Sequence, residues 1–488
     1  MHFLYDDRES GAGKTFSMFR YLIDSPGIYL IAVPRVDLIM EHELAFRAMP
    51  GNGAMVVKSI CSKSGTFSVP CEIKRTMQSW LELGISHGGI FISHEALNLV
   101  DWSLPSLQAN RWVLFIDESP CPWSYYNRRH PITNTHVQEM LAWSELPISG
   151  DKEEDESLKK YVQVSLSAKG EALATSGIDD LAPAYASLLN TIRHGKTAVG
   201  NRSFFEPTGK KNSSTLSVFS VTDPHRFAVF SSVTILSANF RHTFAYLLWN
   251  SDAVTFSPHP VLQANRRRAV PLSARTRIFS FGPKDASINW FKEQCQPLKA
   301  AGEWLATHIN RPAYYTLNGH KEIVDPIRSR HWEKVAPIAI GSNRLTDITA
   351  AAWLVSLKAK PLEYATIRSV FGITRDQFDR AREHEALYQF ALRSNLRDFN
   401  SATPVDLYVV SDRQAKYLCD VLGVAGFEQV GVNLPQSEKP ATDAAPIGRP
   451  PKHQTAEERL EAQRKSKRES AQRTRAQQRI NQQQQKAA

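Results

Sequence analysis

The stretch FLYDDRESGAGKT, residues 3–15, decides how the rest of the chain is interpreted. Residues 3–5 are apolar and predict a short strand, residues 10–13 predict a loop, and the residues from Thr15 onward have the spacing of a helix. A strand, a glycine-containing loop and a helix in this order are typical of a P-loop, which binds the phosphates of a nucleotide. The stretch therefore predicts a nucleotide-binding site.

The residue types of this loop suit a polyphosphate. The two glycines let backbone N–H groups approach the phosphates, the lysine would reach the β- and γ-phosphates, and the threonine hydroxyl would bind Mg²⁺. Arg8 replaces the first glycine of the usual eight-residue pattern. The residues expected to bind the nucleotide are Ser10, Gly11, Ala12, Gly13, Lys14 and Thr15.

Length and composition limit the class of protein. A chain of 488 residues exceeds the size of one hydrophobic core, so we expect at least two domains. The net charge of +10 favours an anionic partner. Five scattered cysteines predict reduced thiols, and no apolar run approaches the roughly 20 residues that cross a bilayer. A chain that opens directly into a P-loop leaves no room for a signal peptide, so we expect a cytoplasmic protein without membrane contact.

Alternating strands and helices predict an α/β fold with a doubly wound parallel sheet. Residues 27–33 are a continuous apolar run between Gly and Pro, which is typical of a strand buried on both faces. Further strands are expected at 54–60, 89–93 and 112–116. Such sheets bind ligands at the carboxyl ends of their strands.

Asp117 and Glu118 directly follow the last of these strands. Beside a P-loop, Asp117 would hold Mg²⁺ and Glu118 would orient or deprotonate the attacking water. The alternative is a helix N-cap, because acidic residues also favour first turns.

We expect a first domain over residues 1–260, interrupted by an insertion at about 145–220 with helices at 156–173 and 179–193. The parallel sheet is expected to resume at 215–221, 227–231 and 233–240. A Pro- and Arg-rich connector follows around 257–273.

A second α/β domain is expected over residues 274–430, without a P-loop of its own. Its predicted strands lie at 277–281, 313–317, 336–340 and 405–410, and its predicted helices at 286–309, 347–357, 364–395 and up to 422. Within it, Gln389, Arg393 and Arg397 stand at i, i+4 and i+8 on one expected helix face. They are either solvated or form an arginine finger that faces the nucleotide of the first domain.

With these elements in order, residues 1–425 resemble a superfamily 2 helicase of the DEAD/DEAH type. The matching stretches are Gly11–Thr15 (motif I), Pro34-Arg35 (Ia), Ile92–Leu97 (Ib), Asp117–Pro120 (II), Leu236–Asn239 (III), Gly341–Asn343 (V) and Gln389…Arg393…Arg397 (VI). The resemblance implies two RecA-like domains that clamp ATP between them, with a nucleic acid across their tops.

Roles of individual residues follow from this resemblance. It implies nucleic-acid contacts at Pro34, Arg35 and His94, and coupling between domains at Ser237, Gly341 and Asn343. Motif II has Ser-Pro after Asp-Glu, and Asn239 replaces a threonine in motif III. The last arginine lies four residues beyond the previous one instead of three. Which arginine is the finger therefore stays open, with Arg397 favoured by order and Arg393 second.

Residues 436–488 differ in composition from the rest of the chain. They contain 12 Lys or Arg and 6 Asp or Glu, a net +6, and almost no large apolar residues. We therefore expect a disordered basic tail. Within it, Gly448-Arg-Pro-Pro-Lys452 resembles an AT-hook, so Arg449 and Lys452 would contact DNA in an A·T minor groove. The alternative is a polybasic arm that binds phosphates without sequence preference.

Together these features predict an ATP- and Mg²⁺-dependent helicase or translocase, acting on DNA more than on RNA, with replication or recombination proteins as partners. One alternative is a DNA-binding scaffold whose nucleotide site is degenerate, as Arg8 and Asn239 suggest. Another is a P-loop NTPase that does not act on nucleic acid.

Overall fold

The structure is a computed structural model. It describes residues 1–62, 68–100, 102, 111–131, 135–146, 158–176, 182–193, 195–206, 213–262, 267–283, 295–319, 323, 325–327, 329–337, 344–359 and 361–431. Residues 1–435 form one compact unit. The predicted tail with Arg449 and Lys452 lies outside the described residues, as do Gly341 and Asn343.

A seven-stranded parallel sheet carries the P-loop. Its order is β12 (Thr255–Pro258), β1 (His2–Asp6), β11 (Ser232–Leu236), β5 (Trp112–Asp117), β2 (Ile28–Val33), β4 (Gly88–Ser93) and β3 (Val56–Ser59). Every residue of β2 and β4 is buried, as expected for strands covered on both faces. The strands that the apolar runs predict in the first part of the chain are therefore present.

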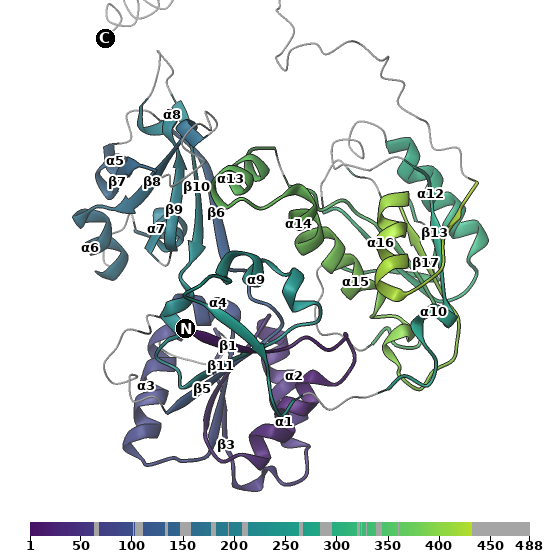
Figure 1. Ribbon diagram of the computed structural model, residues 1–488, viewed down its shortest axis with the longest axis horizontal. Helices are drawn as coiled ribbons and strands as arrows, with labels where there is room; N and C mark the ends of the chain where they lie inside the picture. The colour runs from purple at the N-terminus through teal and green to yellow at the C-terminus, as the bar shows by residue number, and fades with distance from the viewer. Residues whose placement is uncertain are drawn as a thin grey trace, which may run out of the picture. The chain divides into compact units, whose positions relative to one another are not determined.

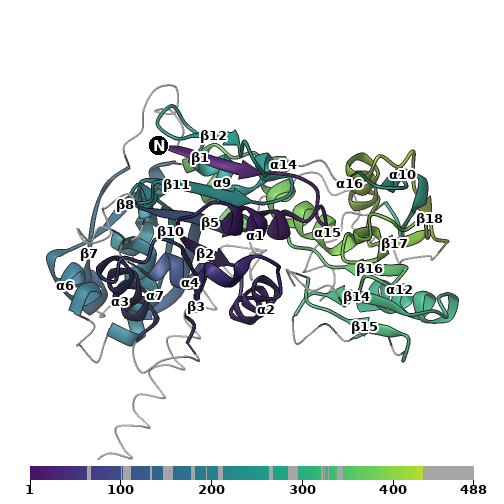
Figure 2. The same cartoon turned by 90° about the horizontal axis from the view of Figure 1, so that it is seen from below.

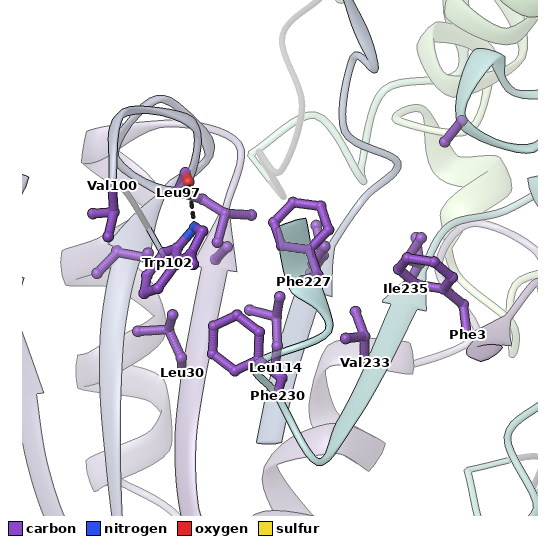
Figure 3. Close-up of a cluster of buried hydrophobic side chains, with 14 of the residues drawn as sticks. Phe3, Leu30, Leu97, Val100, Trp102, Leu114, Phe227, Phe230, Val233 and Ile235 are labelled. Carbon is purple, nitrogen blue, oxygen red and sulfur yellow. Dashed lines mark hydrogen bonds between the residues drawn. The ribbon is translucent and has the colours of Figure 1, made fainter. Parts of the chain in front are cut away.

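Helices cover both faces of this sheet (Figure 1). α1 (Lys14–Asp24) and α2 (Val36–Arg47) pack on one face, and α3 (Val69–Glu82), α4 (His94–Leu99) and α9 (Phe244–Trp249) pack on the other. Figure 3 shows the second core, where Leu30, Leu114 and Val233 lie beside Phe230 and Trp102. The indole Nε1 of Trp102 donates a hydrogen bond to the Leu97 carbonyl at 3.1 Å.

The insertion between β5 and β11 is an antiparallel sheet of its own. Its order is β6 (Trp123–Pro131), β10 (Ser213–Thr222), β9 (Gly195–Asn201), β8 (Tyr161–Leu166) and β7 (Leu141–Glu145). The elements that accompany it are α5 (Thr135–Met140), a 3₁₀ turn (Leu158–Lys160), α6 (Ala168–Ser176), α7 (Ala182–Arg193) and α8 (Arg202–Phe205). Residues from α5 and α7 share a core with β6, β8 and β10.

Three sequence-based expectations in this region are wrong. Residues 215–221 pair with β6 and β9 and do not rejoin the parallel sheet. In the stretch 227–231, residue 227 ends a 3₁₀ turn at Pro224–Phe227 and residues 228–231 form no strand. The stretch 156–173 contains β8 before α6, because Val162 and Val164 alternate with more exposed residues at a period of two.

A second parallel sheet has the order β15 (Trp332–Lys334), β14 (Ala313–Leu317), β16 (Ala350–Leu354), β17 (Val405–Val409), β13 (Thr276–Ser280) and β18 (Glu428–Gln429). α12 (Cys295–His308) packs on one face, and α15 (Glu385–Ala391) and α16 (Asp412–Leu422) pack on the other (Figure 2). Among the described residues of this part, the other elements are α10 (Leu272–Arg275), α13 (Pro361–Phe371), α14 (Arg375–Asp379), a π turn (Arg380–His384) and a 3₁₀ turn (Asn395–Arg397).

The predicted helix at 347–357 is wrong, because residues 350–354 form the central strand β16. All five are buried, and a short apolar run does not distinguish a buried strand from a buried helix. The strand predicted at 336–340 is not seen at 336 and 337, and residues 338–340 lie outside the described residues. The predicted fold class, α/β with two RecA-like parallel sheets, is confirmed.

Among the described residues, no helix combines the length and the apolar character that crossing a bilayer requires.

Candidate nucleotide-binding site

The P-loop connects β1 to α1 with two glycines in the left-handed backbone region. Gly11 has φ 86° and Gly13, the N-cap of α1, has φ 82°. A Cβ atom built on Gly11 would lie 3.0 Å from Arg397 Cγ and 3.1 Å from the Arg397 carbonyl oxygen. Position 11 therefore favours glycine for two reasons: the backbone is left-handed there, and the turn that carries Arg397 leaves no room for a side chain.

Arg8, which replaces the leading glycine, is bound by the end of β1. Its Nε and Nη2 donate to the two oxygens of the buried Asp6 carboxylate, at 2.9 Å and 2.6 Å. The ammonium of Lys14 donates to the carbonyl oxygens of Arg8 and Glu9, at 2.9 Å and 3.2 Å. The loop thus keeps its fold around Lys14 even though its leading residue has a long side chain.

Asp117 at the end of β5 faces Thr15. The Thr15 hydroxyl lies 3.4 Å from both carboxylate oxygens of Asp117, and His42 Nε2 from α2 lies 2.9 Å from Oδ2. His94 Nε2 lies 3.0 Å from the Asp117 backbone oxygen, and burial lowers the pKa of His94 to about 4. Asp117 is therefore held by three neighbours, of which His42 was not predicted from the sequence.

Glu118 has an unusual backbone conformation for a residue with a side chain, with φ 65°. Its N–H donates to the Leu236 carbonyl at 2.8 Å, which fixes the residue to the end of β11. Burial raises the pKa of Glu118 to about 7; the charges of Lys14 and Arg397 oppose this, and those of Asp117 and Glu385 add to it. A carboxyl group that ionises near neutral pH suits a general base.

Gln389, Arg393 and Arg397 approach from the second sheet, but not on one helix as predicted. α15 ends at Ala391, Arg393 follows it, and Arg397 lies in the 3₁₀ turn Asn395–Arg397. The Ser394 hydroxyl accepts from the Leu396 N–H at 3.3 Å and so caps the start of this turn. Arg393 is 3% exposed, and burial lowers its pKa to about 10 and also lowers that of Arg397.

One cavity of about 640 Å³ brings these residues together. Of the predicted phosphate-binding residues, Ala12 is buried and does not line it. The predicted residues that line the cavity are Ser10, Gly11, Gly13, Lys14, Thr15, Asp117, Glu118, Gln389, Arg393 and Arg397.

A second cavity of about 410 Å³ shares Glu118, Gln389 and Arg393 with the first. Pro34, His94 and Ser237 line it, so these three predicted residues lie next to the candidate site. Arg35 is the N-cap of α2 and forms an ion pair with Asp37 at 3.2 Å.

The connector between the sheets also contacts the P-loop. Arg268 Nε lies 2.9 Å from a Glu9 carboxylate oxygen, and its Nη1 donates to the Leu396 carbonyl at 2.6 Å. Its guanidinium stacks 3.9 Å from the ring centre of Phe399. One side chain therefore links the P-loop to the turn that carries Arg397.

The donor set suits Mg²⁺ bound together with phosphates. A hydroxyl and a carboxylate are hard oxygen ligands, and Mg²⁺ is usually held by one or two protein groups plus substrate phosphates and water. No group of three or more His, Cys, Asp or Glu side chains in the described part of the chain forms a metal site of its own.

No protein-family model matches the chain, and no curated protein matches it in sequence. Several solved structures are similar in fold. They include an apo XPD structure (TM-score 0.47, 10% identity, covering 88% of this chain and 96% of that one), Xpd4 of S. tokodaii (0.45, 9%, 88% and 96%), and Dbp5 of S. cerevisiae bound to RNA and ADP BeF3 (0.34, 9%, 88% and 85%). These TM-scores lie below 0.5, so the functional assignment rests on the site itself.

Proposed function

We propose that the chain hydrolyses ATP with Mg²⁺ and uses the energy as a helicase or translocase of the superfamily 2 type. One observation carries this proposal: Lys14, Thr15, Asp117 and Glu118 of the first sheet line one cavity with Arg393 and Arg397 of the second. A site shared by two parallel-sheet halves can couple hydrolysis to their relative movement.

Each side chain has a role in phosphoryl transfer. Lys14 binds the β- and γ-phosphates, and Thr15 and Asp117 hold Mg²⁺, which neutralises phosphate charge when bound. Glu118 takes the proton of the attacking water or orients it. Arg397 is the first candidate for the finger that stabilises the developing charge, because it packs against Gly11, and Arg393 is the second.

Nucleic acid is the proposed partner, and DNA is favoured over RNA because of the AT-hook-like segment at 448–452. Pro34, Arg35 and His94 are proposed contacts, and Ser237, Gly341 and Asn343 are proposed coupling residues. A cytoplasmic location and replication or recombination partners stay predictions.

The first test uses two variants of the cavity. Lys14→Ala should weaken ATP binding, because the ammonium balances ground-state phosphate charge. Glu118→Gln should keep ATP affinity within about twofold and lower kcat by about 10² or more, because the amide cannot take a proton. Equilibrium binding of a fluorescent ATP analogue and steady-state phosphate release measure the two effects.

Single- and double-stranded DNA and RNA are added in turn to the same assay. A helicase or translocase requires nucleic acid for full turnover, a scaffold with a degenerate site shows no turnover, and an NTPase of another kind shows turnover that nucleic acid does not change. Unchanged hydrolysis in both variants would contradict the proposal.

A further inference from the structure

Glu385, the first residue of α15, lies in a hydrogen-bonded chain that crosses between the two sheets twice. Asn239, just after β11, donates from Nδ2 to Glu385 Oε2 at 3.1 Å. Gln389, one helical turn after Glu385, donates from Nε2 to Oε1 at 2.9 Å. The Ser10 hydroxyl of the P-loop in turn donates to Gln389 Oε1 at 3.1 Å. The two ends of this series of hydrogen bonds, Asn239 and Ser10, belong to the half with the first sheet. Its middle, Glu385 and Gln389, belongs to the half with the second sheet.

The two residues at the ends of this series of hydrogen bonds follow neighbouring strands. β1 and β11 pair in parallel, with Asp6 beside Leu236. Ser10 and Asn239 come shortly after these residues, so the second half contacts two adjacent strand ends: Glu385 binds Asn239 directly, and Gln389 links the same carboxylate to Ser10. Leu236 also accepts the hydrogen bond from the N–H of Glu118. The position of Asn239 is thus coupled to that of the proposed general base through the end of β11.

Glu385 lines the smaller cavity and not the larger one, so it does not touch the space in which phosphates would lie. Burial raises its pKa, and the hydrogen bonds from Gln389 and Asn239 and the charge of Lys14 oppose that shift. Both oxygens of this half-buried carboxylate have donors. Such a group restrains its neighbours, since moving either donor away breaks a hydrogen bond to a charged acceptor.

Asn239 itself has a conformation that needs support. Its φ of 53° lies in the left-handed region, which asparagine adopts more readily than most residues. The hydrogen bond from its amide to the Glu385 carboxylate therefore helps to hold the turn after β11 in this conformation.

We propose that Glu385 is a positioning residue for the proposed hydrolysis. It binds the turn after β11 and the side chain of Gln389 at once, and so aligns Glu118 of the first sheet with Arg393 and Arg397 of the second. This inference rests on the proposed function, and it assigns Glu385 a role in turnover and none in holding the nucleotide.

The test compares Glu385→Ala with Glu385→Gln. The alanine variant should lower kcat by on the order of tenfold and leave ATP affinity within about twofold, because only the alignment of the two halves is lost. The glutamine variant should keep most of the turnover. The amide oxygen of the new glutamine still accepts from Asn239. Its NH₂ group can donate to the Gln389 oxygen if the Gln389 amide flips by about 180°, and the Gln389 NH₂ group then donates to the Ser10 hydroxyl.

Two further variants make the comparison specific. Asn239→Ala should lower kcat in the same direction, and the double variant with Glu385→Ala should be no slower than Glu385→Ala alone, because the two residues act through one bond. Glu383→Gln is the matched control: Glu383 is a carboxylate two residues earlier, buried, and it accepts from Leu357 N–H at 2.7 Å and Gln414 Nε2 at 3.0 Å within the second half. It should change thermal stability and leave kcat unchanged.

Amide hydrogen exchange gives a readout that does not need turnover. With ADP bound, Glu385→Ala should speed exchange at residues 8–13 and 237–243, and Glu385→Gln should not. If the wild-type chain hydrolyses no ATP, the proposed function fails and exchange still tests the contact. If Glu385→Ala keeps both wild-type kcat and wild-type exchange, or if Glu385→Gln is as impaired as alanine, the positioning role is overturned while hydrolysis stands.

Discussion

Glu118 combines a left-handed backbone, a half-buried carboxyl group and a backbone hydrogen bond to the neighbouring strand. A side chain in this backbone region costs roughly 1–3 kcal/mol, and such residues persist where the surrounding structure determines them and often lie at functional sites. Here the determinant is the Leu236 carbonyl, which holds the Glu118 N–H at 2.8 Å. The strained conformation points the carboxyl group into the cavity lined by Lys14 and Arg397.

The ionisation of Glu118 predicts a pH dependence. Because burial raises its pKa to about 7, the group is largely protonated below pH 6 and becomes a base only as the pH rises through 7. We expect kcat/KM for ATP, which reports ionisations of the free enzyme, to increase by about tenfold for each pH unit below that value and to level off above pH 8. Steady-state rates from pH 5.5 to 8.5 measure this. An ordinary carboxyl group ionising near 4.5 would instead give a flat profile between pH 6 and 8.

Site residues could be predicted from the sequence when they follow a strand at the position that a known motif gives. This holds for four residues that line the cavity: Lys14, Thr15, Asp117 and Glu118. His42 and Glu385 reach the same region from helices. Neither residue belongs to a motif, so only the packing of α2 and α15 identifies them.

At the scale of elements, the P-loop and the turn at 395–397 form one contact surface. Arg268 joins them through Glu9 and the Leu396 carbonyl, and the backbone of Arg397 approaches Gly11. The predicted helix through Arg393 and Arg397 would not allow this approach. The break after Ala391 brings the backbone of the turn up to the P-loop, which a regular helix face could not do.

Alanine substitutions at the two P-loop glycines test the contact between the P-loop and the turn at 395–397. Alanine at either position adopts a left-handed conformation at a cost of about 1 kcal/mol. Gly11→Ala should also displace Arg397 and lower kcat more than ATP affinity, because its methyl group meets Arg397 Cγ at 3.0 Å. Gly13→Ala meets no atom within 4 Å, so it should leave Arg397 in place and weaken ATP binding, as its methyl group enters the phosphate cavity.

Binding and turnover assays of both variants separate the effects. Equal losses of affinity and kcat in the two variants would show that backbone strain alone is responsible, and the contact between the P-loop and the turn would then have no part in turnover.

The elements themselves were predictable where burial is complete on both faces. β2, β4 and β5 are continuous apolar runs, and each was expected within a few residues of its bounds. The antiparallel sheet was missed for two reasons. β8 lies within the stretch 156–173, which was predicted as a helix, and β10 was assigned to the parallel sheet. β16 was taken for a helix because Ala350–Leu354 has an equally apolar sequence in either structure.

For the whole molecule, charge is distributed unevenly along the chain. Residues 436–488 supply a net +6 of the total +10, while the proposed catalytic residues all lie before residue 398. Deleting 436–488 should therefore leave basal ATP turnover nearly intact and weaken DNA binding. Each lost phosphate contact should reduce the slope of log K against log salt by about 0.9. Titrations at several salt concentrations measure the slope.

The variant Arg449→Ala distinguishes an AT-hook from a basic arm without sequence preference. A minor-groove hook should lose more affinity for A·T-rich than for G·C-rich duplex, because the narrow groove concentrates negative potential around the arginine. Equal small losses on both duplexes would reject the hook and keep the basic arm. No loss after full deletion would reject both.

The strand β1 contains residues 2–6, yet its partners β11 and β12 come from residues 232–236 and 255–258. A ribosome adds about 5–20 residues per second, so the strand that leads into the P-loop waits on the order of ten to fifty seconds for its neighbours. The antiparallel sheet, within residues 123–222, is complete before then. During synthesis the inserted part of the chain can therefore fold first, and the sheet that carries the P-loop is completed only when residue 258 has emerged.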